Sequence, residues 1–185
     1  MEFFKNIRIR IAKAMLSKVV AKTKRKVSYS KLSLIRTIGI VWDASNPYEF
    51  LCISRFYQKM QERKIEVKVF GYYSGKILPQ QYIDIKYFTC LRRNDINFFY
   101  SPVTADSDRF ISNKFDILID INFKKLFPLQ YISSLSNAGF KVGLFEPETK
   151  NSQFDLMMEI KSPVDVDHYL DQVIKYLEMI NSETA

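Results

Sequence analysis

One stretch of 30 residues, Phe115 to Leu144, constrains the fold of this chain more than any other part of the sequence. It begins with the apolar run FDILIDI and ends with FKVGL. Between them, the segment PLQYISSLSN has Pro128 at its start and Gly139 just after its end. Proline is favoured in the first turn of a helix and glycine just past the last turn, so the pattern predicts strand, helix, strand. A strand that is apolar on both faces is typical of a parallel sheet covered by helices on both sides.

The same alternation continues along the chain. We expect strands at 37–43, 65–72, 96–100, 115–121, 140–145 and 154–160, with a short strand or irregular segment at 83–89. We expect helices at 3–16, 47–64, 104–113, 128–137 and 163–180. Strands that alternate with helices predict an α/β fold, a three-layer Rossmann-like or flavodoxin-like and mostly parallel sheet, preceded by a basic N-terminal helix extension.

Charge divides the chain into two parts. Residues 1–36 hold 11 of the 28 basic residues and one of the 20 acidic residues, whereas residues 37–185 hold 17 basic and 19 acidic residues. We therefore predict a basic amphipathic helix and linker over 1–36 and an α/β domain over 37–185. The high pI belongs to the first part, so it gives no reason to expect that the α/β domain binds nucleic acid.

The N-terminal helix places Phe4, Ile7, Ile11 and Met15 at spacings of three and four, and basic residues cover much of its remaining surface. Three interpretations stay open: the helix lies on an anionic membrane surface, binds ribosomal or other RNA through phosphates, or docks on its own domain. The candidate anchoring residues are Phe3, Phe4, Lys5, Arg8, Arg10, Lys13, Lys24, Arg25 and Lys26.

Polar residues follow several of the predicted strands. In open α/β sheets, ligands bind beyond the carboxyl ends of the strands, so these residues are ligand-binding candidates. They are Asp43, Ser45, Asn46, Ser101, Asp120, Asn122 and Lys124. If the sheet is parallel, Asp43 and Asp120 lie at one edge, where two carboxylates could bind Mg²⁺ with phosphate or act as acid and base. The alternative is that these residues cap helices, as Asn46 before Pro47 would.

Several motifs are missing from the sequence. It has neither GxGxxG nor GxxxxGK[ST], and the turn DASNP after the first strand contains no glycine. Dinucleotide binding and P-loop nucleotide binding are therefore not expected. The only histidine, His168, has no second ligand at a metal-binding spacing, and Cys52 and Cys90 form no CxxC motif. We predict no cofactor, no metal site and two reduced thiols.

The segments IGIVWDAS, VFGYYSGK, INFFYSP, FDILIDINFKKLFPLQYISSLSNAGFKVGL and FDLMMEI resemble a small bacterial family of uncharacterised proteins, domain of unknown function 6913. The resemblance extends over nearly the whole chain and implies a basic N-terminal helix followed by an α/β body. No catalytic residues come with it. A shorter likeness, over about 30 residues from 115, is to the acceptor-side domain of heptosyltransferase-like enzymes. Those enzymes need a second domain for which this chain has no room.

Together these patterns favour a non-enzymatic binding or interaction module whose basic part associates with an anionic surface. The alternative is a small enzyme or ligand-binding domain that uses the Asp43/Asp120 edge for a phosphate-bearing or sugar-like ligand. No apolar run is long enough to span a bilayer, and no RNA-binding pattern of interleaved aromatic and basic residues occurs. We expect a cytoplasmic protein, located at the inner membrane face if the membrane interpretation holds, and no sequence-specific DNA binding.

Overall fold

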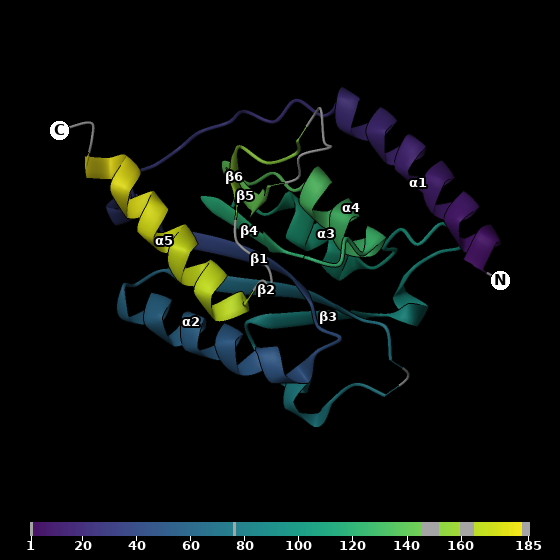
Figure 1. The fold of residues 1–185 in the computed structure, drawn as a ribbon, viewed down its shortest axis with the longest axis horizontal. Helices are drawn as coiled ribbons and strands as arrows, with labels where there is room; N and C mark the ends of the chain where they lie inside the picture. Colours follow the sequence, from purple (N-terminus) through teal and green to yellow (C-terminus); the bar gives the residue numbers. More distant parts are fainter. Residues whose placement is uncertain (1, 76, 146–151, 160–164, 183–185) are drawn as a thin grey trace.

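The computed structural model describes residues 2–75, 77–145, 152–159 and 165–182, with side chains from residue 4 to residue 180 within those ranges. Its strands are β1 (Thr37–Asp43), β2 (Glu66–Tyr73), β3 (Phe88–Arg92), β4 (Ile117–Ile121), β5 (Phe140–Leu144) and β6 (Leu156–Met158). Its helices are α1 (Glu2–Lys22), α2 (Phe50–Glu62), α3 (Ala105–Ser112), α4 (Phe127–Leu135) and α5 (Val166–Ser182) (Figure 1).

The six strands form one sheet in the order β3-β2-β1-β4-β5-β6, and every neighbouring pair is parallel. This is the strand order of the Rossmann fold, and it differs from the flavodoxin order. The predicted α/β class is confirmed. The strand order reverses between β1 and β4, which places the crevice that ligands use in such sheets at the carboxyl ends of these two strands.

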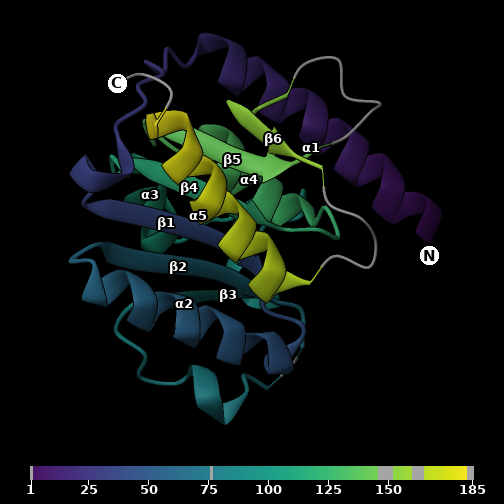
Figure 2. The same cartoon turned by 60° about the vertical axis from the view of Figure 1, so that its left-hand side comes forward.

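Helices cover both faces of the sheet. On one face, α2 and α5 bury a large cluster that includes Trp42, Ile53 and Tyr169. On the other face, α3 and α4 pack on Val41, Leu118 and their neighbours. Figure 2 shows α2 and α5 side by side in front of the sheet. The central strands β1 and β4 are buried along almost their whole length, as expected of strands covered on both sides.

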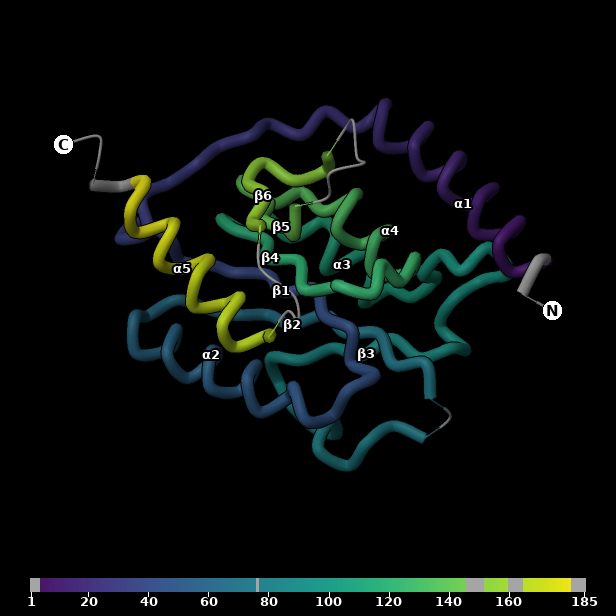
Figure 3. The backbone as a smooth tube through the Cα atoms, in the orientation of Figure 1, coloured from purple at the N-terminus to yellow at the C-terminus, as the bar shows by residue number. Residues whose placement is uncertain are grey.

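The helix α1 adds a further layer outside α4. Ala12 and Leu16 are buried against Phe127 of α4, with Phe99 and Tyr100 at the edge of the same small cluster. The segment after α1 then crosses the molecule to reach β1 (Figure 3). The predicted N-terminal helix is therefore longer than the periodicity indicated, since it continues past residue 16 to Lys22. The division at residue 36 stays a prediction, and residues from both sides of it pack together.

The predicted third strand is wrong. Residues 96–100 form a turn, and the edge strand that pairs with β2 is Phe88–Arg92. Asn97 holds the turn, because its Oδ1 accepts hydrogen bonds from the backbone N–H groups of Phe99 (2.9 Å) and Ser101 (3.1 Å). The aromatic residues that suggested a strand instead pack near α1. Ser101, predicted to follow a strand end, therefore belongs to this turn.

The other predicted elements lie close to their expected positions. The helix over 104–113 is α3, and Thr104 caps it by accepting a hydrogen bond from the Ser107 N–H at 3.2 Å. The predicted helix 47–64 begins with a short 3-10 turn, Pro47–Glu49, before α2. Parts of the predicted elements 154–160 and 163–180 lie outside the described residues.

Candidate functional site

At the end of β1, Asp43 is held by contacts within the protein. Its Oδ1 accepts a hydrogen bond from the Ser45 N–H at 3.0 Å, and its Oδ2 lies 3.1 Å from Nζ of Lys124. The Asp43 side chain is 7% exposed. The parallel register pairs Val41 with Asp120 and Trp42 with Ile121, so the strand-end candidates of β1 and β4 do share one edge. Within it, Lys124 and Asp43 pair with each other.

The turn after β1 is occupied by its own side chains. Asn46 Oδ1 accepts a hydrogen bond from the Tyr48 N–H at 3.3 Å, so it caps the helical segment as the alternative interpretation required. Glu49 accepts from the Asn46 amide at 3.0 Å and from the Trp42 indole N–H at 3.1 Å. The Tyr82 hydroxyl donates to the Ala44 carbonyl at 3.0 Å. A pyrophosphate would need glycine and open backbone N–H groups here, but the turn has no glycine, and the Ala44 and Ser45 N–H groups donate to the Tyr72 carbonyl and to Asp43.

At the end of β4, a tight turn is organised by Asn122. Its side-chain amide donates to the Leu126 carbonyl at 3.0 Å, and its Oδ1 accepts from the Leu126 N–H at 2.8 Å. Within the turn, Lys125 has φ 54°, a left-handed conformation that is uncommon for a residue with a Cβ. This conformation places the Lys125 side chain beside the end of β4, in the wall of a cavity.

That cavity, the β4–α1 cavity, has a volume of about 100 Å³ and lies between α1, the end of β4, α4 and β5. Its polar lining consists of Lys13, Asp120, Asn122, Lys125, Gln130 and Gln153. Its apolar lining consists of Phe123, Leu144 and Phe154. Of the residues predicted for ligand binding, only Asp120 and Asn122 line this cavity. Lys13 was predicted only as an anchoring residue, and no sequence signal marked Gln130 or Gln153.

Asp120 is buried beneath the cavity. Its Oδ1 accepts a hydrogen bond from the Asn122 N–H at 2.8 Å, and its Oδ2 accepts a hydrogen bond from the Ser133 hydroxyl of α4. Lys141 of β5 lies nearby, 2% exposed, and donates to the carbonyls of Ser133 (2.7 Å) and Ser134 (3.0 Å). Burial lowers the pKa of Lys141 to about 8, although the Asp155 and Asp120 charges oppose that shift.

A second candidate surface is the outer side of α1. Phe4, Ile7, Ile11 and Met15 are 70%, 41%, 46% and 52% exposed, and we call these four residues the exposed α1 stripe. Ala12 and Leu16, which dock the helix, follow Ile11 and Met15 by one residue and so face a direction about 100° away. The helix thus has two apolar sides, one against α4 and one in solvent. Lys5, Arg10, Lys18 and Lys22 are exposed on the same helix.

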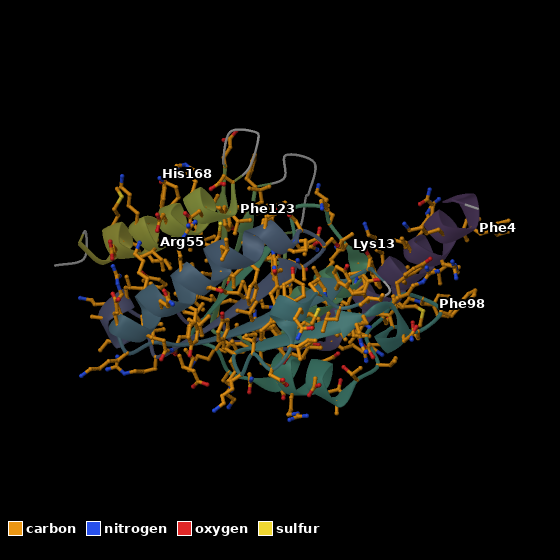
Figure 4. The ribbon with its side chains drawn as sticks, turned by 90° about the horizontal axis from the view of Figure 1, so that it is seen from below. Phe4, Lys13, Arg55, Phe98, Phe123 and His168 are labelled. Carbon is orange, nitrogen blue, oxygen red and sulfur yellow. The ribbon has the colours of Figure 1, made fainter. Side chains whose placement is uncertain are left out.

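A second exposed aromatic residue lies beside the N-terminal end of α1. Phe98, in the turn after β3, is 66% exposed, and it projects at the same end of the molecule as Phe4 (Figure 4). Arg8 connects the two segments: its guanidinium donates to the Tyr100 hydroxyl at 2.8 Å and lies 4.6 Å from the Phe98 ring centroid. The side chain of Phe3, also predicted for anchoring, lies outside the described side chains.

The other predicted anchoring residues lie at the opposite end of α1. Lys24 and Lys26 are exposed. Arg25 instead pairs with Asp155 at 2.6 Å and donates to the carbonyls of Ala138 (3.1 Å) and Gly139 (3.0 Å). These bonds hold the segment after α1 against the sheet, so we do not count Arg25 in a binding surface.

The remaining titratable side chains that could do chemistry are not brought together. His168 is exposed on α5 (Figure 4). Cys52 and Cys90 are unpaired, and burial raises the pKa of both thiols, which disfavours the reactive thiolate. Within the described ranges, no group of three or more His, Cys, Asp or Glu residues is placed to hold a metal ion.

The fold and its strand order define a Rossmann-type α/β protein with an additional basic helix. The chain belongs to DUF6913, a family of unknown function whose model matches residues 8–180. The matched range includes most of α1 as well as the whole sheet. No curated protein matches the sequence. Among the described helices, none combines the length and apolar character needed to cross a membrane.

Proposed function

We propose that this protein is a peripheral binding module that associates with an anionic membrane surface through α1. The observation that carries the proposal is the exposed α1 stripe. Its four apolar residues stay in solvent although the helix already buries a different side against α4. A docked helix that keeps an apolar stripe and many basic residues exposed offers both kinds of contact that an anionic membrane interface takes up.

The charge of α1 supports the same function. Arg10, Lys18 and Lys22 are exposed near the stripe, and each basic residue close to an anionic surface contributes about 1 kcal/mol. Phe98 adds a second exposed aromatic side chain at the same end of the molecule as Phe4. RNA binding would use the basic residues but would leave the apolar stripe without a role, so the stripe favours a membrane. A cytoplasmic location at the inner membrane face is part of this proposal.

Flotation of the full chain with lipid vesicles tests the function. We expect binding to vesicles that contain phosphatidylglycerol, weak binding to pure phosphatidylcholine, and weaker binding to both at high salt, because ions screen exposed charges. Ribosomal RNA is added in a parallel sample. Salt-sensitive binding to RNA without any flotation on anionic vesicles would overturn the proposal and assign the basic helix to nucleic acid instead.

A further inference from the structure

The β4–α1 cavity is separate from the surface proposed to meet the membrane. On α1, Lys13 lines the cavity, and it is rotated by about 200° from Ile11 of the exposed α1 stripe. A membrane in contact with the stripe would therefore lie on the other side of the helix. The cavity also lies at the carboxyl ends of β4 and β5, beside the point where strand order reverses, which is where ligands bind in open α/β sheets.

The cavity wall carries two ammonium groups. Lys13 comes from α1 and Lys125 from the turn after β4. Lys13 forms no ion pair with any residue that the structure describes. Among the described residues, the acidic residue of the lining is Asp120, and its two carboxylate oxygens accept hydrogen bonds from the Asn122 N–H and the Ser133 hydroxyl. The described lining residues thus include two lysines and one aspartate, a balance that favours an anionic ligand.

One of the lining residues, Gln130, has an acceptor for which the described residues supply no donor. Oε1 of Gln130 is buried and has no hydrogen-bond partner among the described residues. Buried polar atoms almost always have a partner, and an unpartnered one is costly. A ligand hydroxyl would supply the missing donor. The ligand that fits therefore has an anionic group for the lysines and a hydroxyl for the glutamine.

The volume limits the size of that ligand. At about 100 Å³, the cavity is smaller than the roughly 300–1,000 Å³ of pockets that enclose drug-sized ligands. This is room for a phosphate group and a short hydroxylated carbon chain, and not for an enclosed nucleotide. Phe123 and Phe154 supply apolar walls against which the carbon chain can pack.

We propose that the β4–α1 cavity binds the phosphate group of a small phosphorylated polyol, with Lys13 and Lys125 holding the phosphate and Gln130 accepting a ligand hydroxyl. Lysine is a common phosphate ligand in proteins, where it acts as a point charge. Because one of the two lysines comes from α1, the site needs that helix in its docked position. The proposal depends on none of the residues of the exposed α1 stripe, so it stands or fails separately from membrane binding.

Binding of three probes to the full chain tests the site by calorimetry and by thermal unfolding. Glycerol 3-phosphate is expected to bind saturably and raise the Tm, since a ligand that binds only the folded state stabilises it. Inorganic phosphate is expected to bind about tenfold more weakly, and glycerol not at all. These probes are soluble, so their binding is measured without a membrane surface.

Matched variants complete the test. Lys13→Gln is expected to weaken glycerol 3-phosphate binding about tenfold or more, whereas Lys18→Gln, an exposed lysine on the same helix, leaves it unchanged. Gln130→Met is expected to remove the preference for glycerol 3-phosphate over inorganic phosphate. No saturable binding of either phosphate compound at millimolar concentration would overturn the proposal. Equal losses in Lys13→Gln and Lys18→Gln would overturn it too, because they would indicate non-specific attraction to the helix.

Discussion

Arg8 of α1 lies over the ring of Phe98, with its guanidinium carbon 4.6 Å from the ring centroid. The same guanidinium donates a hydrogen bond to the Tyr100 hydroxyl at 2.8 Å. These contacts join two segments about 90 residues apart in the sequence and fix the N-terminal half of α1 against the body. They also hold Phe98 at the same end of the molecule as Phe4 (Figure 4), so two exposed aromatic side chains from different segments lie at this end.

The docking of α1 can be tested by comparing a substitution on its buried side with a substitution on its exposed side. Leu16 is 6% exposed in the cluster with Phe127, whereas Ile11 is 46% exposed. Leu16→Ala removes buried contacts and is expected to destabilise α1 docking by about 2 kcal/mol, while Ile11→Ala changes it by less than about 0.5 kcal/mol. Hydrogen exchange of the α1 amides measures both effects. Equal protection in the two variants would show that Leu16 does not hold the helix.

The two strand-end aspartates are expected to differ in their effect on stability. Both carboxylates are buried, but Asp43 forms an ion pair with the exposed Lys124. Asp120 instead accepts a hydrogen bond from the Ser133 hydroxyl and lies near the buried Lys141. Asp120→Ala leaves a buried ammonium without its neighbouring carboxylate and is expected to cost about 3 kcal/mol. Asp43→Ala is expected to cost about 1 kcal/mol. Urea unfolding of both variants measures the difference, and a larger loss for Asp43→Ala would contradict the assignment.

The buried Lys141 predicts a pH dependence of stability. Burial lowers its pKa to about 8 from the ordinary value of 10.5, so the folded protein releases this proton first as pH rises. Between those two values the unfolded chain binds more protons, and the free energy of unfolding therefore rises with pH. Relative to Lys141→Met, wild type should gain about 2 kcal/mol between pH 8 and pH 10.

The comparison with Lys141→Met is needed because tyrosines and other lysines titrate in the same range. Urea unfolding of both proteins at several pH values gives the difference between their free energies of unfolding. A difference that stays constant from pH 8 to pH 10 would show that Lys141 keeps an ordinary pKa in the folded protein.

The apolar pattern was sufficient to predict most of the sheet. The run FDILIDI is β4, since a strand buried on both faces consists of apolar residues almost throughout. The edge strand β3 was predicted only as a short strand or irregular segment at 83–89, because it is partly buried and contains Thr89 and Cys90. INFFY resembled a strand because it is rich in apolar and aromatic residues. In the structure, its Phe99 and Tyr100 pack near α1 and not within the sheet. A short apolar run does not reveal which element it packs against.

The candidate site was predicted only in part. Position at a strand end was enough to identify Asp120 and Asn122, because parallel strands end at the same edge. The other polar lining residues come from α1, the turn after β4, α4 and the segment after β5, which meet only in the folded chain. For α1 itself, periodicity gave the Phe4–Met15 stripe but not the docking side, since Ala12 and Leu16 lie among basic residues.

The most direct test of membrane association changes the exposed α1 stripe without changing charge. In vesicle flotation with phosphatidylglycerol, Ile7→Gln/Ile11→Gln is expected to bind about tenfold or more weakly than wild type, because two apolar side chains no longer enter the interface. The control is Leu34→Gln/Leu51→Gln, which changes side chains that are 63% and 66% exposed elsewhere on the surface. The account predicts that the control binds like wild type. Unchanged binding of the Ile7/Ile11 variant, or an equal loss in the control, would contradict it.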